Sequence, residues 1–143
     1  MENINIIHGE KYEDIRGILS FVNEFNLKAN NIQRFYNIKH NDPSIVRAWQ
    51  AHKKEQKWFY VLSGSFKIVL VKPDNWTNPS SLLPYSDFIL NSNEPKMLHV
   101  PGGFANGFKA LEPGSIITIF SDFTLSESKI DSYRFESNLW YTW

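Results

Sequence analysis

Two segments of the sequence hold most of the side chains that could do chemistry. The first, RAWQAHKKEQKWFYVLSG (residues 47–64), contains Gln50, His52 and Lys57, and the second, VPGGFANGFKALEPG (residues 100–114), contains Asn106. An imidazole titrates near neutral pH, so His52 can act as a general base. The amides of Gln50 and Asn106 cannot remove a proton from carbon, but they can hold a hydroxyl group or an enolate oxygen. These residue types predict a polar site for proton transfer.

The composition excludes several other kinds of chemistry. The chain has no cysteine, which rules out disulfides, iron–sulfur clusters and a thiol nucleophile. Its 15 Lys and Arg balance 15 Asp and Glu, so the basic field typical of nucleic-acid binding is absent. No apolar run approaches the ~20 residues of a membrane span, and the start MENINIIHGEKYEDIRG has no apolar core of a signal peptide. We therefore expect a cytoplasmic protein with no nucleic-acid or membrane partner.

The elements that must position these side chains are predicted to be strands. The length of 143 residues is typical of one domain, which we place at residues 1–143. Roughly ten short β-rich runs alternate with Pro, Gly, Asn and Asp, a pattern that predicts an all-β barrel or sandwich. In residues 57–62, strict alternation places Lys57, Phe59 and Val61 on one face. Ser63-Gly64 predicts a hairpin turn, and no segment has a convincing helical period.

The two segments have the layout of the two cupin motifs, in which three histidines and one glutamate hold a metal ion inside a jelly roll. At those four positions this chain has Gln50, His52, Gln56 and Asn106. Glu55 is one residue away, and strand alternation would turn it to the opposite face. One imidazole with three amides is a poor ligand set for zinc, iron or manganese. We therefore expect a site without a metal ion or other cofactor.

The chain resembles the metal-free sugar-nucleotide cupins of the RmlC-like type over about residues 9–143. DIRG (14–17), IQRFYNI (32–38) and RAWQAHKK (47–54) are similar to the dTDP-sugar 3,4-ketoisomerases. QKWFYVLSG (56–64), VPGGFANGF (100–108) and YRFESNLWYTW (133–143) are similar to the dTDP-4-dehydrorhamnose 3,5-epimerases. Small cupins of the "sugar epimerase" type from polysaccharide gene clusters share this mixture. The resemblance implies a double-stranded β-helix, which is the jelly-roll cupin fold, and a homodimer.

The resemblance also implies an activity. The substrate would be a nucleoside-diphosphate 4-keto-6-deoxyhexose, used in the biosynthesis of surface polysaccharide or lipopolysaccharide. A base removes the proton beside the ketone, a fixed donor or cation stabilises the enolate, and an acid returns the proton. By position, the catalytic candidates are His52 as base, Lys57 as enolate stabiliser, Tyr36 as acid, and Glu136. The candidates for substrate binding are Arg16, Arg34, Arg47, Gln50 and Asn106.

Each assignment has a structural alternative. The arginines can be surface residues in ion pairs, His52 can be a core histidine with its hydrogen bonds satisfied, and Tyr36 can be a packing residue. The loss of family histidines at positions 50 and 106 leaves a second function open, a cupin that binds a nucleotide sugar or carbohydrate without catalysis. A metal-dependent dioxygenase is disfavoured by the missing ligands. The aromatic end LWYTW (139–143) is expected to pack on the barrel or on a dimer partner.

Overall fold

The structure, a computed structural model, describes residues 3–143 and consists almost entirely of strands. The elements in chain order are β1 (Asn5–His8), β2 (Glu10–Asp14), β3 (Gly17–Phe21), β4 (Arg34–His40), β5 (Val46–His52), β6 (Lys57–Ser63), β7 (Ser65–Val71), β8 (Tyr85–Asn91), β9 (Lys96–Val100), β10 (Phe104–Ala110), β11 (Ser115–Ser121), α1 (Leu125–Lys129) and β12 (Tyr133–Arg134). The prediction of an all-β domain is confirmed, with one short helix that the sequence pattern did not predict.

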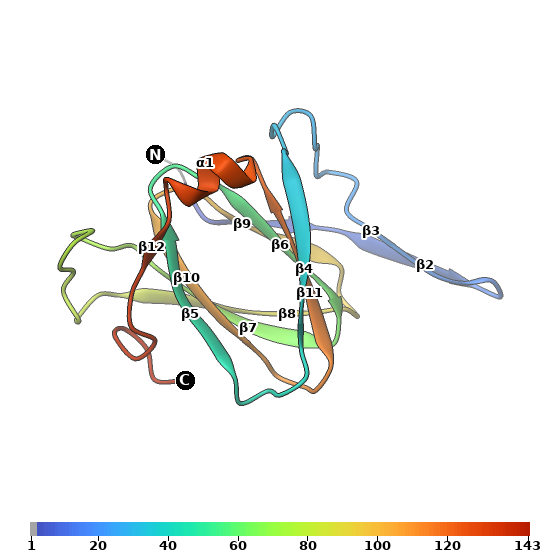
Figure 1. Cartoon of the computed structure of the whole chain (residues 1–143). Coiled ribbons are helices and arrows are strands. Elements are labelled where there is room, and N and C mark those ends of the chain that lie inside the picture. Colours follow the sequence, from blue (N-terminus) through green and yellow to red (C-terminus); the bar gives the residue numbers. More distant parts are fainter. Residues whose placement is uncertain (1–2) are drawn as a thin grey trace.

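Two five-stranded antiparallel sheets face each other and build the body of the molecule (Figure 1). Their strand orders are β1-β9-β6-β11-β4 and β12-β5-β10-β7-β8, so most successive strands lie in opposite sheets. This winding between two sheets is a double-stranded β-helix, or jelly roll, as predicted. The edge strand β4 of one sheet and β5 of the other border the same side of the sandwich, and α1 crosses between them at one end (Figure 1).

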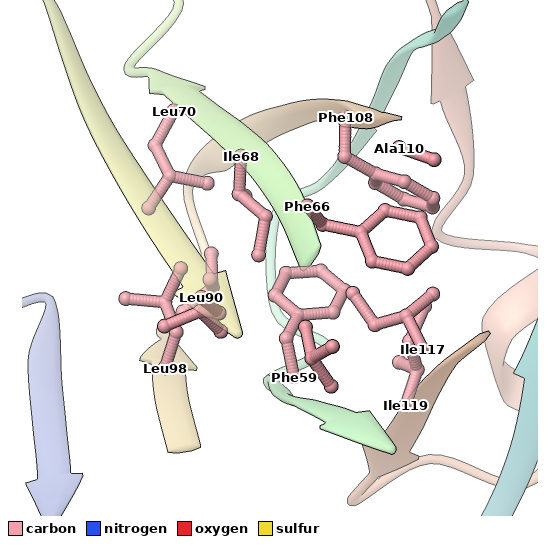
Figure 2. Packing of buried hydrophobic residues seen from close by; sticks show 12 residues of the cluster. Phe59, Phe66, Ile68, Leu70, Leu90, Leu98, Phe108, Ala110, Ile117 and Ile119 are labelled. Carbon is pink, nitrogen blue, oxygen red and sulfur yellow. The ribbon is translucent and has the colours of Figure 1, made fainter. Parts of the chain in front are cut away.

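The core lies between the sheets and is built by strand alternation. In β7, Phe66, Ile68 and Leu70 point inward, while Val69 and Val71 point to the outer face of the same sheet. Phe59 and Val61 of β6 also join the inner cluster, which confirms the predicted face of that strand. Figure 2 shows side chains from both sheets meeting there, among them Phe59, Phe66, Leu98, Phe108 and Ile117. Burial of these side chains holds the two sheets together.

Gly64 is a crossing point between the sheets, so the prediction of a hairpin at Ser63-Gly64 is wrong. β6 pairs with β9 and β11, whereas β7 pairs with β8 and β10 in the opposite sheet. Gly64 has a φ of +73°, and a Cβ atom there would collide with the hydroxyl of Ser115. A glycine at this position fits a tight corner between the layers as well as it fits a hairpin turn.

The aromatic C-terminal segment packs on the outer face of the β12-β5-β10-β7-β8 sheet, in agreement with the prediction that it is not a free tail. Trp140 is 7% exposed, and its ring centroid lies 5.3 Å from that of Trp49. The indole N–H of Trp140 donates a hydrogen bond to the carbonyl of Ser80 at 2.7 Å. Trp143 also lies against Trp49 at 5.7 Å. This second apolar layer covers the back of β5 and leaves its other face to the interior.

The helix α1 begins at a capping box that stabilises its first turn. The hydroxyl of Thr124 accepts a hydrogen bond from the backbone N–H of Glu127, and the Glu127 carboxylate accepts one from the N–H of Thr124 at 2.9 Å. The sequence TLSE (124–127) is the corresponding signal, and it could have predicted this helix. The short element matters because its far end leads into Asp131 and β12, which belong to the site described below.

We predict that Thr124→Ala lowers the free energy of unfolding by about 1 kcal/mol, because the first turn loses its cap. Urea denaturation followed by circular dichroism measures the loss. Ser126→Ala is the matched control, since Ser126 is exposed in the same helix and alanine favours helix there. Equal stabilities of the two variants would contradict a role of the cap in holding α1.

A separate hairpin of β2 and β3 extends from the body of the molecule (Figure 1). Four of its apolar side chains are more than half exposed: Tyr12, Ile15, Ile18 and Leu19. An isolated two-stranded hairpin is marginally stable in water unless its apolar face is covered. Within one chain, these four side chains of the hairpin remain uncovered.

Candidate active site

A cavity of about 570 Å³ opens between β4 and β5, beneath α1. Strands of both sheets border this cavity, so side chains from both layers of the sandwich converge on it. Its walls are formed by Arg34, Tyr36, Ile38, Val46, Arg47, Ala48, Trp49, Gln50, Lys57, Asn106, Phe108, Ile119, Leu125, Ser128, Lys129, Ser132 and Arg134. The cavity therefore brings together six of the nine predicted site residues: Arg34, Tyr36, Arg47, Gln50, Lys57 and Asn106.

The cavity is strongly cationic. Arg34, Arg47 and Arg134 contribute guanidinium groups, and Lys57 and Lys129 contribute ammonium groups. The walls contain no Asp or Glu among the described residues. A cleft lined by one sign of charge attracts ligands of the opposite sign, and arginine matches phosphate oxygens with two parallel hydrogen bonds. The charge pattern favours an anionic ligand with phosphate groups.

Lys57 is the most unusual cation of this group because it is only 3% exposed. It is the first residue of β6, on the inward face, and its Nζ lies 3.5 Å from Oε1 of Gln50. Burial, assisted by three arginines and opposed by Glu55, lowers the pKa of Lys57 to about 8. The side chain is thus a cation at neutral pH that can lose its proton only slightly above it.

Tyr36 lines the cavity from β4, next to the cationic groups. The guanidinium carbon of Arg34 lies 5.0 Å from the centre of the Tyr36 ring, and Nζ of Lys57 lies 5.9 Å from it. Burial raises the pKa of Tyr36 above its ordinary value. The phenol therefore stays protonated at neutral pH and can donate a hydrogen bond or a proton to a ligand.

Gln50 and Asn106 face each other across neighbouring strands. They are register partners in the antiparallel pair of β5 and β10, and both line the cavity. Because paired residues point to the same side of a sheet, two amides with donors and acceptors are presented together. This juxtaposition suits the hydroxyl groups of a sugar.

His52 is buried near this group, but it does not line the cavity. Its Nδ1 lies 2.9 Å from the carbonyl oxygen of Asp131, which makes Nδ1 the donor and leaves Nε2 as the basic nitrogen. Nε2 is buried and has no hydrogen-bond partner among residues 3–143. Burial, followed by the nearby charge of Lys57, lowers the pKa of His52. The imidazole is therefore mainly neutral at neutral pH.

Glu55 lies in the interior, so the prediction that it points to the opposite face is wrong. Its carboxylate accepts a hydrogen bond from the hydroxyl of Ser121 at 2.6 Å, and its Oε1 lies 3.4 Å from Nδ1 of His52. Gln56 turns the other way and contacts Asp122 and His99. The reason is that residues 53–56 form an irregular loop, and the inward face of β6 resumes in phase with Glu55 rather than Gln56.

Besides His52, two predicted site residues do not line the cavity of their own chain. Arg16 lies at the tip of the β2–β3 hairpin, where its exposed guanidinium pairs with Asp14. Glu136 is exposed on the segment after β12, and its backbone carbonyl accepts a hydrogen bond from Leu139. Within one chain, the structure corrects the expectation that either residue meets the other candidates.

The sequence interpretation missed two cations of the cavity, Lys129 and Arg134. Arg134 is the register partner of Gln50 in the short pairing of β12 with β5, which carries it to the cavity. Lys129 is the last residue of α1. The capping signal at Thr124 predicts where α1 begins but not where it ends, and no local pattern shows which strand β12 joins. Among residues 3–143, no three His, Asp or Glu side chains are grouped as ligands for a metal ion.

Comparisons with known proteins place this geometry in a family. The chain matches the family model described as FdtA: WxcM-like, C-terminal, over residues 2–138. No curated protein sequence matches it significantly. No helix in the described residues is long and apolar enough to cross a membrane.

Several solved structures are similar to this chain. A mutant of the 3,4-ketoisomerase QdtA from Thermoanaerobacterium thermosaccharolyticum, in complex with TDP-4-keto-6-deoxyglucose, shares 22% identity, with 94% of this chain and 89% of that chain covered and a TM-score of 0.73. The TDP-quinovose 3,4-ketoisomerase WlaRB from Campylobacter jejuni shares 22% identity, with 97% and 98% covered and a TM-score of 0.70. The RmlC epimerase of Mycobacterium tuberculosis shares 15% identity, with 98% and 74% covered and a TM-score of 0.76.

These identities are low, so the likeness to solved structures establishes the fold, which is that of the RmlC-like cupins. The family match covers nearly the whole chain and includes both strands that border the cavity. The chain therefore belongs to the WxcM-like, C-terminal (FdtA) family.

Proposed function

We propose that the chain is an isomerase that acts on a nucleoside-diphosphate 4-keto-6-deoxyhexose, by epimerisation or by a shift of the carbonyl group. The observation that carries the proposal is the cavity that gathers three arginines, a buried Lys57 and a protonated Tyr36 without any carboxylate in its wall. The cations match a diphosphate, and the buried ammonium matches an oxygen that becomes negative during the reaction. The similar structures include a ketoisomerase with TDP-4-keto-6-deoxyglucose bound.

The cavity residues have distinct roles in this proposal. Arg34, Arg47 and Arg134 hold the diphosphate, and Gln50 and Asn106 hold the sugar hydroxyls. Lys57 donates a hydrogen bond to the ketone oxygen and stabilises the enolate as the neighbouring carbon loses its proton. Tyr36 returns a proton to carbon on the product side and regains one from the base or solvent. No net change of oxidation state occurs, because the same number of protons leaves and enters.

His52 is the proposed base, acting through Nε2. The donation of Nδ1 to the carbonyl of Asp131 keeps the lone pair on Nε2, as a base requires. Nε2 of His52 is buried and has no hydrogen-bond partner among residues 3–143, so it is available to a group of the substrate. His52 follows the cavity residue Gln50 by two positions in β5, so their side chains are directed to the same side of the sheet. The His52 variant is therefore the most informative one for the mechanism.

Incubation with TDP-4-keto-6-deoxyglucose in deuterated water tests the proposed function. We expect deuterium to enter at C3 or C5 of the sugar, detected by NMR and mass spectrometry, because the carbon acid exchanges with solvent through the enolate. The His52→Ala variant should bind TDP normally but lose this exchange. Exchange that persists in His52→Ala would assign the base to another residue.

A second candidate function is binding of a nucleotide sugar without catalysis. The absence of a histidine from the residues that line the cavity and the amides at positions 50 and 106 favour it. In that case isothermal titration calorimetry would show that TDP-sugars bind, while no 4-keto donor would exchange deuterium. Absence of both binding and exchange would contradict both functions.

The proposal retains three predictions from the sequence that concern the cell and the assembly. We propose that the chain acts in the cytoplasm, in the supply of sugars for surface polysaccharide or lipopolysaccharide, and as a homodimer. The exposed apolar side chains of the β2–β3 hairpin support the homodimer, because a second copy would cover them. Arg16 at the tip of that hairpin can meet a ligand only in another copy of the chain.

A further inference from the structure

Glu55 is a buried carboxylate next to a cavity that has no acidic residue in its wall. Its side chain is 0% exposed, although it lies in the loop between β5 and β6. The loop is held by Asp131, whose carboxylate accepts hydrogen bonds from the backbone N–H groups of Lys53, Lys54 and Glu55 at 2.9–3.0 Å. Moving a carboxylate out of water costs several kcal/mol unless charges and hydrogen bonds compensate. The loop therefore holds Glu55 in place for an interaction with neighbouring cations.

The contacts of Glu55 identify those cations. Oε2 accepts a hydrogen bond from Ser121 at 2.6 Å and lies 3.4 Å from a guanidinium nitrogen of Arg34. Oε1 has no hydrogen-bond partner among residues 3–143, and it lies 3.4 Å from Nδ1 of His52. Arg34 lines the cavity, so one end of its guanidinium is anchored by Glu55 behind the wall. The carboxylate is thus incompletely satisfied by hydrogen bonds and acts chiefly through its charge.

Lys57 lies in the same buried cluster as this charge, because Lys57 and the Arg34 that pairs with Glu55 both lie against the Tyr36 ring, at 5.9 Å and 5.0 Å from its centre. Burial and the charges of Arg34, Arg47 and Arg134 all favour its neutral form, and Glu55 is the acidic group that opposes them. The titratable and charged groups that act on Lys57 or line its cavity are Arg34 and Tyr36 on β4, Arg47 and His52 on β5, Glu55 in the β5–β6 loop, Lys129 on α1 and Arg134 on β12. The strands β9 and β11, which pair with β6 at Lys57, present the uncharged residues Val100 and Ser121 there. Without Glu55, cations would dominate this environment.

We propose that Glu55 is a positioning residue that keeps Lys57 cationic at neutral pH and holds Arg34 toward the cavity. Its role for catalysis rests on the proposed function, in which Lys57 stabilises the enolate only while it carries a proton. Its effect on the protonation of Lys57 does not depend on that function. The two claims can therefore be tested separately.

The first test follows Lys57 itself, by NMR titration of protein labelled at the ε-carbon of lysine. The Lys57→Arg variant assigns the Lys57 signal. We expect Glu55→Gln to lower the titration midpoint of Lys57 by about one pH unit, because loss of a nearby opposite charge disfavours the protonated form. Ser121→Ala is the matched control, because it removes a hydrogen bond of Glu55 but leaves its charge, and its midpoint should stay near that of the unmodified chain.

Two further variants complete the test. Arg34→Met should shift the midpoint of Lys57 upward, since it removes a cation, and should leave the sign of the Glu55 effect unchanged. Glu55→Met also removes the charge and replaces Glu55→Gln if that variant does not fold, as judged by circular dichroism. An unchanged Lys57 midpoint in the folded charge-removing variant would overturn the proposal.

The second test measures the deuterium exchange reaction between pH 6 and pH 10. If the proposed function is right, the pH above which activity is lost should be lower in Glu55→Gln, by the same amount as the NMR midpoint of Lys57. In Glu55→Asp, which keeps the charge, this pH should return close to that of the unmodified chain. A shifted NMR midpoint in a chain that never exchanges deuterium would refute the enzymatic function and leave the role of Glu55 standing. If the chain is active and its activity falls at the same pH in Glu55→Gln as in the unmodified chain, the inference is overturned.

Discussion

Lys57→Met is expected to lower kcat/KM for the 4-keto sugar nucleotide by roughly 10²- to 10³-fold, the usual loss when one donor to a developing oxyanion is removed. The methionine side chain fills a similar space but cannot donate a hydrogen bond to the enolate oxygen. Lys57 is 3% exposed, so water cannot easily replace the missing group. Steady-state kinetics and the rate of deuterium exchange measure the loss, while TDP affinity should fall much less.

The pH dependence of kcat/KM shows whether Lys57 acts as a cation or as a base. The pKa of Lys57 is lowered to about 8, so the side chain is protonated below this pH and neutral above it. An enolate stabiliser works in the protonated form, and kcat/KM should therefore fall as the pH rises through about 8. Lys57→Arg remains charged at all accessible pH values, so it should keep part of the activity and show no fall of kcat/KM near pH 8. Activity that instead rises through pH 8 would show that Lys57 acts as a base.

Arg47→Met is expected to weaken binding of TDP by roughly 10- to 100-fold, the effect of losing a hydrogen bond between charged groups. Arg47 lines the cavity from β5 and has no carboxylate partner among the described residues, so its guanidinium is available to a ligand. Arg34, by contrast, is partly engaged by Glu55. Isothermal titration calorimetry at low and moderate salt measures the change, which should shrink as salt screens the charges.

The control for this experiment is Lys72→Met, which removes one positive charge from an exposed position after β7, away from the cavity. Its TDP affinity should match that of the unmodified chain at each salt concentration. A similar loss in both variants would mean that TDP responds to the overall charge of the protein. No loss in Arg47→Met would place the diphosphate outside this cavity.

Local alternation made much of the inner wall predictable. Lys57, Phe59 and Val61 share a face because successive residues of a strand point to opposite sides, and the structure confirms this face. The same rule failed for Glu55, because it holds only within a strand and residues 53–56 are irregular. The turn signal at Ser63-Gly64 failed for a different reason, because the sequence pattern of a hairpin is the same as that of a corner between two sheets.

From the sequence we could predict the class of fold, the absence of thiol chemistry, the faces of regular strands such as β6, and the kinds of side chain available for proton transfer. All of these depend on composition or on residues a few positions apart. Tertiary structure alone decided which side chains meet: Arg134 reaches the cavity through the pairing of β12 with β5, whereas Arg16 and Glu136 stay outside it. The physical reason is that strand order and loop paths depend on packing over the whole chain, and no local periodicity encodes them.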